Sequence, residues 1–276
     1  MRSCKLPSGA NKPVLGIGTW RMGESARRRA QELDAIVYAL ELGYPMIDTA
    51  EMYGDGVAEE IVGEAIKGRA KKPFIVSKVY PHNATRSGTI AACERSLARL
   101  GIEQIDLYLL HWRGGARLEE TFEAFHRLRQ VGKIADFGVS NFDTDDMEDA
   151  ARLDKGLTGS NQVLYCLSRR GPEHDLLPWL RKHAIPLMAY SPLDQGSLLS
   201  KTSLKKLAGE QGCSPAQLAL AWLLAQPGVV TIPKSSTRER VKENLGAVDV
   251  KLSREILAAL DKSFPPPKGR QALQML

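Results

Sequence analysis

The chain has 276 residues, of which 43% are hydrophobic and 25% charged, which suits one large globular domain or two small ones. The formal net charge of +6 comes from scattered basic residues, without the long basic run or interleaved aromatic residues typical of a nucleic-acid surface. No stretch of 18 apolar residues predicts a membrane-spanning helix, and the first twelve residues lack the apolar core of a signal peptide. We therefore expect a soluble cytoplasmic protein that binds neither nucleic acid nor a membrane.

The four cysteines stand far apart in the sequence, at Cys4, Cys93, Cys166 and Cys213. No two of them form a Cys-x-x-Cys pair. The sequence therefore predicts reduced thiols, as in a cytosolic protein, and no metal site.

The segment Cys4–Lys12 contains Pro7-Ser8-Gly9, a turn-forming sequence that predicts a small N-terminal hairpin. Eight short apolar segments follow, and each predicts a buried strand. These segments are Val14–Gly18, Pro45–Ile47, Phe74–Ser77, Ile105–Leu110, Ala135–Val139, Gln162–Leu164, Pro186–Ala189 and Val229–Ile232.

Stretches with helical spacing lie between the strand segments. Their apolar residues recur three or four positions apart, as in Leu33-Ile36-Val37-Leu40, Ile90-Cys93-Leu97-Leu100, Phe122-Phe125-Leu128 and Leu218-Trp222-Ala225. The last of these helices is expected to begin with Ser214 as its N-cap and Pro215 at its first helical position.

Strand and helix segments alternate along the whole chain, without a Ser/Gly-rich linker between them. Such alternation predicts a parallel sheet with helical crossovers. Eight units in a chain of this length favour closure of the sheet over an open doubly wound arrangement. We predict a single α/β domain over residues 1–276, a (β/α)8 TIM barrel with an N-terminal β-hairpin.

The best glycine cluster, from Gly16 to Gly23, does not match a dinucleotide-binding fingerprint. Its third glycine falls two residues too late for GxGxxG, and the bulky Trp20 lies in between. A phosphate-binding GxxxxGK[ST] loop is also missing from the sequence. Any nucleotide bound here is held by other means.

Polar residues follow the predicted strands at the ends where a barrel forms its active site. They are Asp48, Lys78, His111, Ser140, Asn141, Gln162, Tyr190, Ser191 and Lys234. Many polar residues at strand ends simply belong to exposed loops. That explanation does not suit Lys78 and His111, because each stands at the end of a very apolar run, FIVSK and LYLLH. A lysine at that depth needs a carboxylate partner, which Asp48 on the neighbouring strand can supply.

These residues suit the reduction of a carbonyl group. An ion-paired Lys78 near Tyr53 is expected to stabilise the phenolate and lower the tyrosine pKa from its usual ~10, as a general acid requires. His111 can donate a hydrogen bond to the substrate oxygen, and a cofactor has to supply the hydride. A Schiff-base aldolase that uses Lys78 is an alternative, but it gives Tyr53 and His111 no role.

The chain resembles the aldo-keto reductase family from about Leu6 to Leu276, and most of all its bacterial members that reduce methylglyoxal. The matching stretches are GIGTW (16–20), MIDTAEMYG (46–54), VSKV (76–79), DLYLLHW (106–112), GKIADFGVSNF (132–142), NQVLY (161–165), AYSPL (189–193) and IPKSSTRERVKENL (232–245). The resemblance implies a catalytic tetrad of Asp48, Tyr53, Lys78 and His111, with Tyr53 as proton donor. It also implies a regulatory, cofactor-binding subunit without turnover as a further alternative.

The resemblance implies NADPH/NADP+ as cofactor, with nicotinamide contacts from Ser140, Asn141 and Gln162 and with Tyr190 stacked on the ring. The full set of implied cofactor residues is Gly18, Thr19, Trp20, Asp48, Ser140, Asn141, Gln162, Tyr190, Ser191, Leu193, Ile232, Pro233, Lys234, Ser235, Ser236, Arg240, Glu243 and Asn244. The implied substrate pocket consists of Trp20, Tyr53, His111 and Trp112.

The segment after the eighth strand has its own chemical interpretation. This segment offers two cationic side chains and a hydroxyl next to the start of a helix, from Lys234, Arg240 and Ser235. Such a group of donors and charges is a good receptor for a phosphate dianion. A solvated basic turn beside Glu239 and Glu243 is the alternative. The resemblance implies a clamp on the 2′-phosphate of NADP, with Glu243 and Asn244 at the adenine.

Departures from the family pattern bear on the substrate. Cys166-Leu167 replaces the His-Pro pair of many members, the loop Arg113–Arg117 is short, and the tail beyond Phe264 is brief and begins with prolines. Short loops predict an open pocket for small aldehydes and ketones, with 2-oxoaldehydes such as methylglyoxal suggested by the resemblance. We expect the protein to act on this small carbonyl substrate as a monomer.

Overall fold

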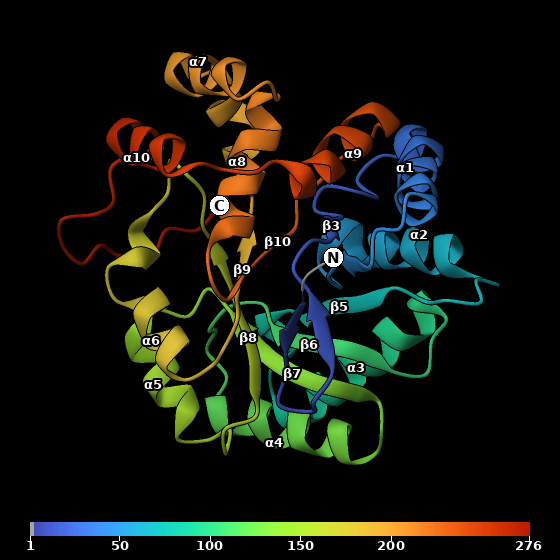
Figure 1. Cartoon of the computed structure of the whole chain (residues 1–276). Coiled ribbons are helices and arrows are strands. Elements are labelled where there is room, and N and C mark those ends of the chain that lie inside the picture. The colour runs from blue at the N-terminus through green and yellow to red at the C-terminus, as the bar shows by residue number, and fades with distance from the viewer. Residues whose placement is uncertain (1–2) are drawn as a thin grey trace.

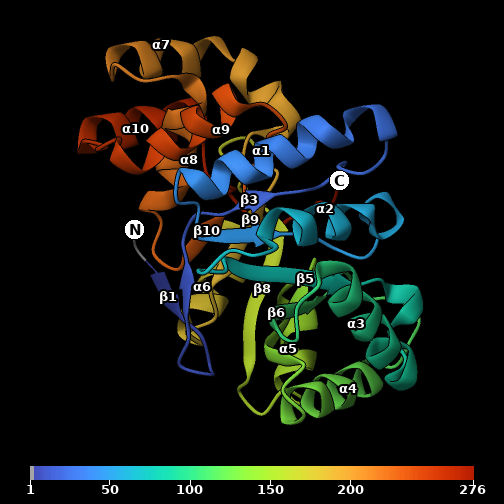
Figure 2. The same cartoon turned by 90° about the vertical axis from the view of Figure 1, so that its right-hand side faces the viewer.

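The computed structural model describes residues 3–276, in which the large parallel sheet contains eight strands. Its strands stand in chain order, each paired in parallel with the next, and helices follow them on the outside (Figures 1 and 2). They are β3 (Ile17–Gly18), β4 (Met46–Asp48), β5 (Phe74–Val79), β6 (Ile105–Leu110), β7 (Ile134–Ser140), β8 (Thr158–Leu164), β9 (Leu187–Tyr190) and β10 (Val229–Thr231). All eight predicted strands are present, with ends displaced by up to four residues.

The first and last strands meet, which closes the sheet into a barrel. Backbone bridges join Leu15 to Thr231 and Gly18 to Lys234. Glycine is needed at this closure, because a Cβ on Gly18 would lie 2.9 Å from the carbonyl oxygen of Ile232. The predicted (β/α)8 barrel is confirmed.

The helices pack their apolar faces on the outside of the barrel. They are α1 (Arg29–Glu41), α2 (Val57–Ile66), α3 (Arg86–Leu100), α4 (Leu118–Gln130), α5 (Thr144–Ala151), α6 (Leu176–Lys182), α7 (Thr202–Glu210), α8 (Pro215–Ala225), α9 (Arg238–Leu245) and α10 (Arg254–Ser263). Helix α8 has Ser214 as its N-cap and Pro215 at its first helical position, as predicted, and Ser214 and Gln217 form a capping box. The Ser214 hydroxyl accepts from the Gln217 amide over 3.2 Å, and the Gln217 side chain accepts from the Ser214 amide over 3.0 Å.

The predicted hairpin is also present, as β1 (Ser3–Lys5) paired antiparallel with β2 (Asn11–Pro13). The Ser8 amide in its turn donates to the Asp136 carboxylate of β7 over 3.1 Å. From β2, Lys12 extends into the protein, where it is fully buried and donates to the Ser160 hydroxyl of β8 over 2.8 Å. The hairpin is thus fixed to the barrel by polar contacts.

The interior of the barrel is packed with apolar side chains, among them Val76, Leu107 and Leu109. A larger apolar cluster fills the space between strands and helices. The four cysteines are free thiols. Across residues 3–276, the structure contains no helix long and apolar enough to cross a membrane and no group of three or more acidic, histidine or cysteine side chains placed to hold a metal ion.

Candidate active site

The alternation of side chains along the strands explains why polar groups gather at one end of the barrel. A layer of apolar side chains inside the barrel comes from β4, β5, β6 and β9, and consists of Met46, Val76, Leu109 and Met188. In each of these four segments, the residue two positions later in the sequence is polar; these residues are Asp48, Lys78, His111 and Tyr190, in the same order. The same inward face therefore carries both layers, and the polar one lies at the carboxyl ends of the strands.

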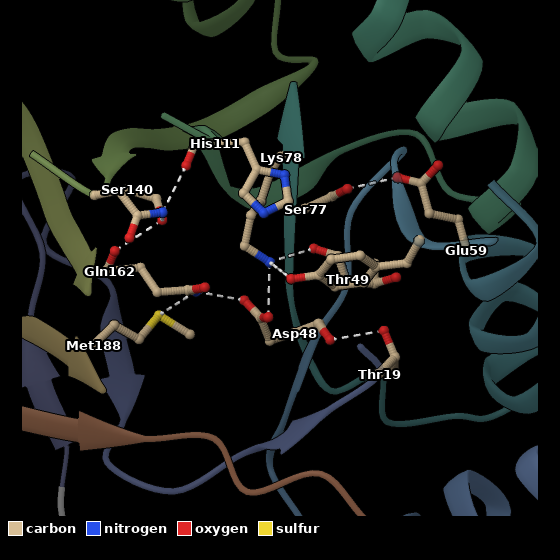
Figure 3. Close-up of polar contacts among 12 residues, drawn as sticks. Thr19, Asp48, Thr49, Glu59, Ser77, Lys78, His111, Ser140, Gln162 and Met188 are labelled. Atoms are coloured by element: carbon tan, nitrogen blue, oxygen red, sulfur yellow. Dashed lines mark hydrogen bonds and ion pairs between the residues drawn. The ribbon is translucent and has the colours of Figure 1, made fainter. Parts of the chain in front are cut away.

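Lys78 is the centre of the polar layer (Figure 3). Its Nζ atom donates to Asp48 Oδ1 over 2.7 Å, to the Thr49 carbonyl over 2.8 Å and to the Tyr53 hydroxyl over 3.3 Å. The rings of Tyr53 and His111 meet edge to face, with centroids 5.6 Å apart. The structure brings together all four residues of the predicted tetrad.

Burial dominates the acidity of these groups. It raises the pKa of Asp48 and lowers the pKa of Lys78, and the attraction between the two charges opposes both shifts. Burial and the nearby Lys78 hold the pKa of His111 well below its usual value, so the imidazole is neutral at physiological pH. The Nδ1 atom of His111 has no hydrogen-bond partner among the described residues.

The predicted lowering of the Tyr53 pKa is wrong for the chain as it stands. Burial, followed by the negative charge of Asp48, raises the pKa of Tyr53 well above its ordinary value. The phenol therefore stays protonated in the resting site. Its hydrogen bond with Lys78 remains available to stabilise a phenolate that forms when the proton leaves.

Amide and hydroxyl groups line the site on the side of β7, β8 and β9. The Asn141 amide donates to the His111 carbonyl over 3.1 Å, and its Oδ1 atom accepts from the Tyr190 hydroxyl over 3.0 Å. Gln162 donates to the second carboxylate oxygen of Asp48 over 2.7 Å. Its Oε1 atom has no hydrogen-bond partner in residues 3–276, so the Gln162 carbonyl can accept from a bound molecule.

These side chains surround one cavity of about 290 Å³. The predicted site residues that line it are Gly18, Trp20, Asp48, Tyr53, His111, Trp112, Ser140, Asn141, Gln162, Tyr190, Ser191, Ile232 and Lys234. Thr19 lies behind this set, with its hydroxyl bonded to the Asp48 carbonyl over 3.0 Å. A concave, largely apolar space with a few convergent polar groups is typical of a small-molecule site.

The predicted phosphate segment continues away from the cavity. The residues of this segment that do not line the cavity are Pro233, Ser235, Ser236, Arg240, Glu243 and Asn244; the predicted cofactor residue Leu193, after β9, does not line it either. Arg240 is exposed on α9, whereas the neighbouring Arg238 is bound to Asp34 of α1 and lies over the Tyr38 ring. Within the described chain, Arg240 is thus the arginine of this segment that is free to meet an anion.

Three residues that line the cavity were not predicted: Met52, Met275 and Leu276. Met52 follows Asp48 in the same loop and could have been found from the barrel pattern. The other two come from the tail, which folds back and forms part of the cavity wall.

Comparisons with known proteins agree with this geometry. Residues 14–264 match the model of the Aldo/keto reductase family. The chain is 47% identical to methylglyoxal reductase YeaE of Escherichia coli over 96% of this chain and 95% of that protein. It is 37% identical to glyoxal reductase of Bacillus subtilis over 93% and 91% of the two chains.

Solved structures show the same fold. An aldo-keto reductase from Klebsiella pneumoniae in complex with NADPH superposes with a TM-score of 0.95 at 45% identity, covering 100% of this chain and 99% of that one. A second structure from the same organism, with NADP and acetate, gives a TM-score of 0.96 at 45% identity and the same coverage. The barrel, the tetrad at its carboxyl end and the family match over most of the chain lead to one conclusion: this chain is an oxidoreductase that belongs to the aldo/keto reductase family.

Proposed function

We propose that this chain is an NADPH-dependent carbonyl reductase that converts small aldehydes and ketones, 2-oxoaldehydes such as methylglyoxal among them, to alcohols. The observation that carries the proposal is the position of Lys78 Nζ, which touches the Asp48 carboxylate and the Tyr53 hydroxyl at once. The 47% identity to a methylglyoxal reductase and the 37% identity to a glyoxal reductase support the substrate class.

Tyr53 is the proton donor in this proposal. Its raised pKa keeps the phenol protonated until a carbonyl oxygen gains negative charge beside it. Lys78 then stabilises the phenolate through the hydrogen bond that it already makes, and Asp48 holds Lys78 in place. The neutral His111 donates a hydrogen bond to the same oxygen and orients the substrate.

The residues present fit a nicotinamide cofactor. When bound, NADPH supplies the hydride to the carbonyl carbon. In this proposal the carbonyl of Gln162 and the side chains of Ser140 and Asn141, which line the cavity, hold the carboxamide, and the Tyr190 ring stacks on the nicotinamide. Lys234, Ser235 and Arg240 would hold the 2′-phosphate.

The same site supports the remaining parts of the proposal. We propose that the protein acts as a monomer built as one domain over residues 1–276, since one barrel carries all four residues of the tetrad. Four free thiols support a location in the cytoplasm. The aldolase alternative is disfavoured, because Lys78 is fully buried and its Nζ atom already has three partners.

The experiment is to mix the purified protein with NADPH and methylglyoxal and to follow the absorbance of the reduced nicotinamide. Turnover supports the reductase. Binding of NADPH without turnover of methylglyoxal or other small aldehydes supports the regulatory subunit instead. Cleavage of a carbon–carbon bond, with trapping of Lys78 by borohydride, supports the aldolase.

A further inference from the structure

The segment that carries Tyr53 lies between β4 and α2, over residues 49–56. The Lys78 ammonium donates to the Tyr53 hydroxyl over 3.3 Å, which is the longest of its three hydrogen bonds. A contact of this kind is no longer a hydrogen bond beyond about 3.5 Å. A small shift of the segment would therefore separate the phenol from the ammonium.

The backbone of this segment does not keep its conformation unaided. Gly54, Asp55 and Gly56 have positive φ angles of 55°, 54° and 93°. Asp55 is not a glycine, and such a residue stays in the left-handed region only where surrounding contacts hold it there. The position of Tyr53 thus depends on contacts between the segment and the rest of the barrel.

Glu51 makes such contacts close to the phenol. Its side chain is buried, and its Oε1 atom accepts from the Tyr80 amide over 2.8 Å and from the Asn83 side chain over 3.0 Å. Its Oε2 atom accepts from Arg95 of α3 over 3.3 Å. Tyr80 directly follows β5, the strand that carries the ammonium. The carboxylate therefore ties the segment to the end of that strand.

Glu51 and Tyr53 belong to one tight turn. The Tyr53 amide donates to the Ala50 carbonyl over 3.1 Å, and Glu51 lies between these two residues. The Glu51 amide in turn donates to the Lys78 carbonyl over 3.4 Å. Because residues of one turn move together, displacement of the Glu51 carboxylate would move the phenol relative to Lys78.

A second carboxylate holds the chain just after this segment. Glu59, fully buried in the first turn of α2, accepts from the Ser77 hydroxyl of β5 over 2.5 Å (Figure 3). Its other oxygen accepts from Arg99 over 2.7 Å. Arg99 lies four residues after Arg95 on α3, so both arginines come from one face of that helix. Both sides of Tyr53 are thus bound to β5 or to the loop after it.

We propose that Glu51 is a positioning residue, which holds Tyr53 at the distance from Lys78 that proton transfer needs. The inference rests on the proposed function, in which Tyr53 donates the proton. In the part of the chain that the structure describes, Glu51 does not line the cavity, so it acts through the turn and not on the substrate. Reach matters more than charge here, because Oε1 meets two neutral donors and the one cation, Arg95, is half exposed.

The kinetic test separates the reach of the side chain from its charge. Glu51→Gln keeps the length and the acceptor for Tyr80 and Asn83, so kcat for methylglyoxal should stay within about fivefold, the size of one lost half-exposed ion pair. Glu51→Asp keeps the charge but is one methylene shorter, so kcat should fall about tenfold to 100-fold, as for a catalytic group misplaced by ~1 Å. The KM for NADPH should not change in either variant.

The matched control is Glu60→Asp, which makes the same change at a neighbouring glutamate of α2. Glu60 is exposed, and its side chain has no hydrogen bond or ion pair within residues 3–276. This variant should keep the kcat of the unmodified protein. The reverse order at position 51, with Glu51→Asp near normal and Glu51→Gln impaired, would assign the effect to charge and overturn the proposal.

A double-variant cycle tests whether Glu51 acts through the phenol. In single turnovers with excess enzyme saturated with NADPH, Glu51→Asp added to Tyr53→Phe should cause no further loss, because the hydroxyl that Glu51 positions is already gone. Titration with NADPH counts the folded, binding-competent molecules in each sample. An equal factor of loss in both backgrounds would indicate a general structural role and overturn the proposal.

The same set of proteins keeps this inference apart from the proposed function. If the unmodified protein does not turn over, or if Tyr53→Phe keeps near-normal kcat, the proposed proton donor fails and this inference fails with it. If Tyr53→Phe is impaired but Glu51→Asp matches Glu60→Asp, only the role of Glu51 fails and the reductase stands.

Discussion

The Lys78 ammonium lies 2.7 Å from the Asp48 carboxylate in a place that water hardly reaches, since their side chains are 0% and 3% exposed. A buried ion pair of this kind adds little net stability, but removal of one partner leaves the other charge uncompensated. The role of the pair is therefore to hold the Lys78 ammonium in position against the Tyr53 hydroxyl, which Lys78 also contacts. This relationship determines how variants of the tetrad should behave.

Lys78→Met should lower the free energy of unfolding by about 3–5 kcal/mol and abolish most turnover, because it leaves Asp48 buried and unpaired. Adding Asp48→Asn should restore much of the stability without restoring activity. Urea unfolding and NADPH oxidation measured on the same three proteins would test this. A single variant as stable as the unmodified protein would contradict a charged pair.

The tetrad could be predicted from the sequence because each of its strand residues follows an apolar run whose alternation fixes the inward face. Lys78 comes two positions after Val76, and His111 two positions after Leu109. The acidity of Tyr53 could not be predicted in the same way. Its pKa depends on how completely the folded chain removes water, and burial outweighed the nearby cation.

The tail shows a second limit of sequence reasoning. Residues 265–276 have no helical or strand periodicity, so no local pattern indicates where they lie. Their position is set by contacts with distant residues, such as Arg270 with Asp145 and Asp175. Likewise, only the structure shows that Arg238 is bound to Asp34 while Arg240 is exposed.

That difference between the two arginines gives a matched pair of variants. Arg240→Ala should raise the KM for NADPH strongly and leave the KM for NADH nearly unchanged, because a charge-assisted contact to the 2′-phosphate is lost. Arg238→Ala should change the two values equally, since its guanidinium is occupied by Asp34. Steady-state kinetics with both cofactors would check this, and an equal loss for NADPH and NADH in Arg240→Ala would remove Arg240 from the clamp.

Lys12 provides a prediction about stability and pH. Burial lowers the pKa of Lys12 to about 7, against about 10.5 for an exposed lysine, and its Nζ atom donates to Ser160. The unfolded chain therefore binds more protons than the folded one between about pH 7 and 10.5. It follows that Lys12 makes stability rise with pH across this window and costs the folded state a few kcal/mol below it.

Lys12→Met should consequently stabilise the protein at pH 7 and reduce the gain in stability between pH 7 and pH 9.5. Denaturant unfolding at both values, in parallel with the unmodified protein, isolates the contribution of Lys12 from other titrating groups. Lys5→Met is a control, because Lys5 is an exposed residue of the same hairpin. If Lys12→Met proves less stable than the unmodified protein at pH 7, the ammonium is better compensated in the folded barrel than burial implies.

The last prediction concerns the proton donor. Tyr53→Phe keeps the aromatic ring beside His111 and removes only the hydroxyl, so the protein should remain folded. NADPH affinity should hardly change, because the predicted phosphate clamp at Lys234 and Arg240 does not include Tyr53. Carbonyl reduction should fall by at least ~100-fold, as is typical when a general acid is lost. Circular dichroism, fluorescence titration with NADPH and turnover of methylglyoxal would measure the three quantities. A folded variant that binds NADPH and keeps near-normal kcat would identify another proton donor, and His111, which also lines the cavity, would be tested next.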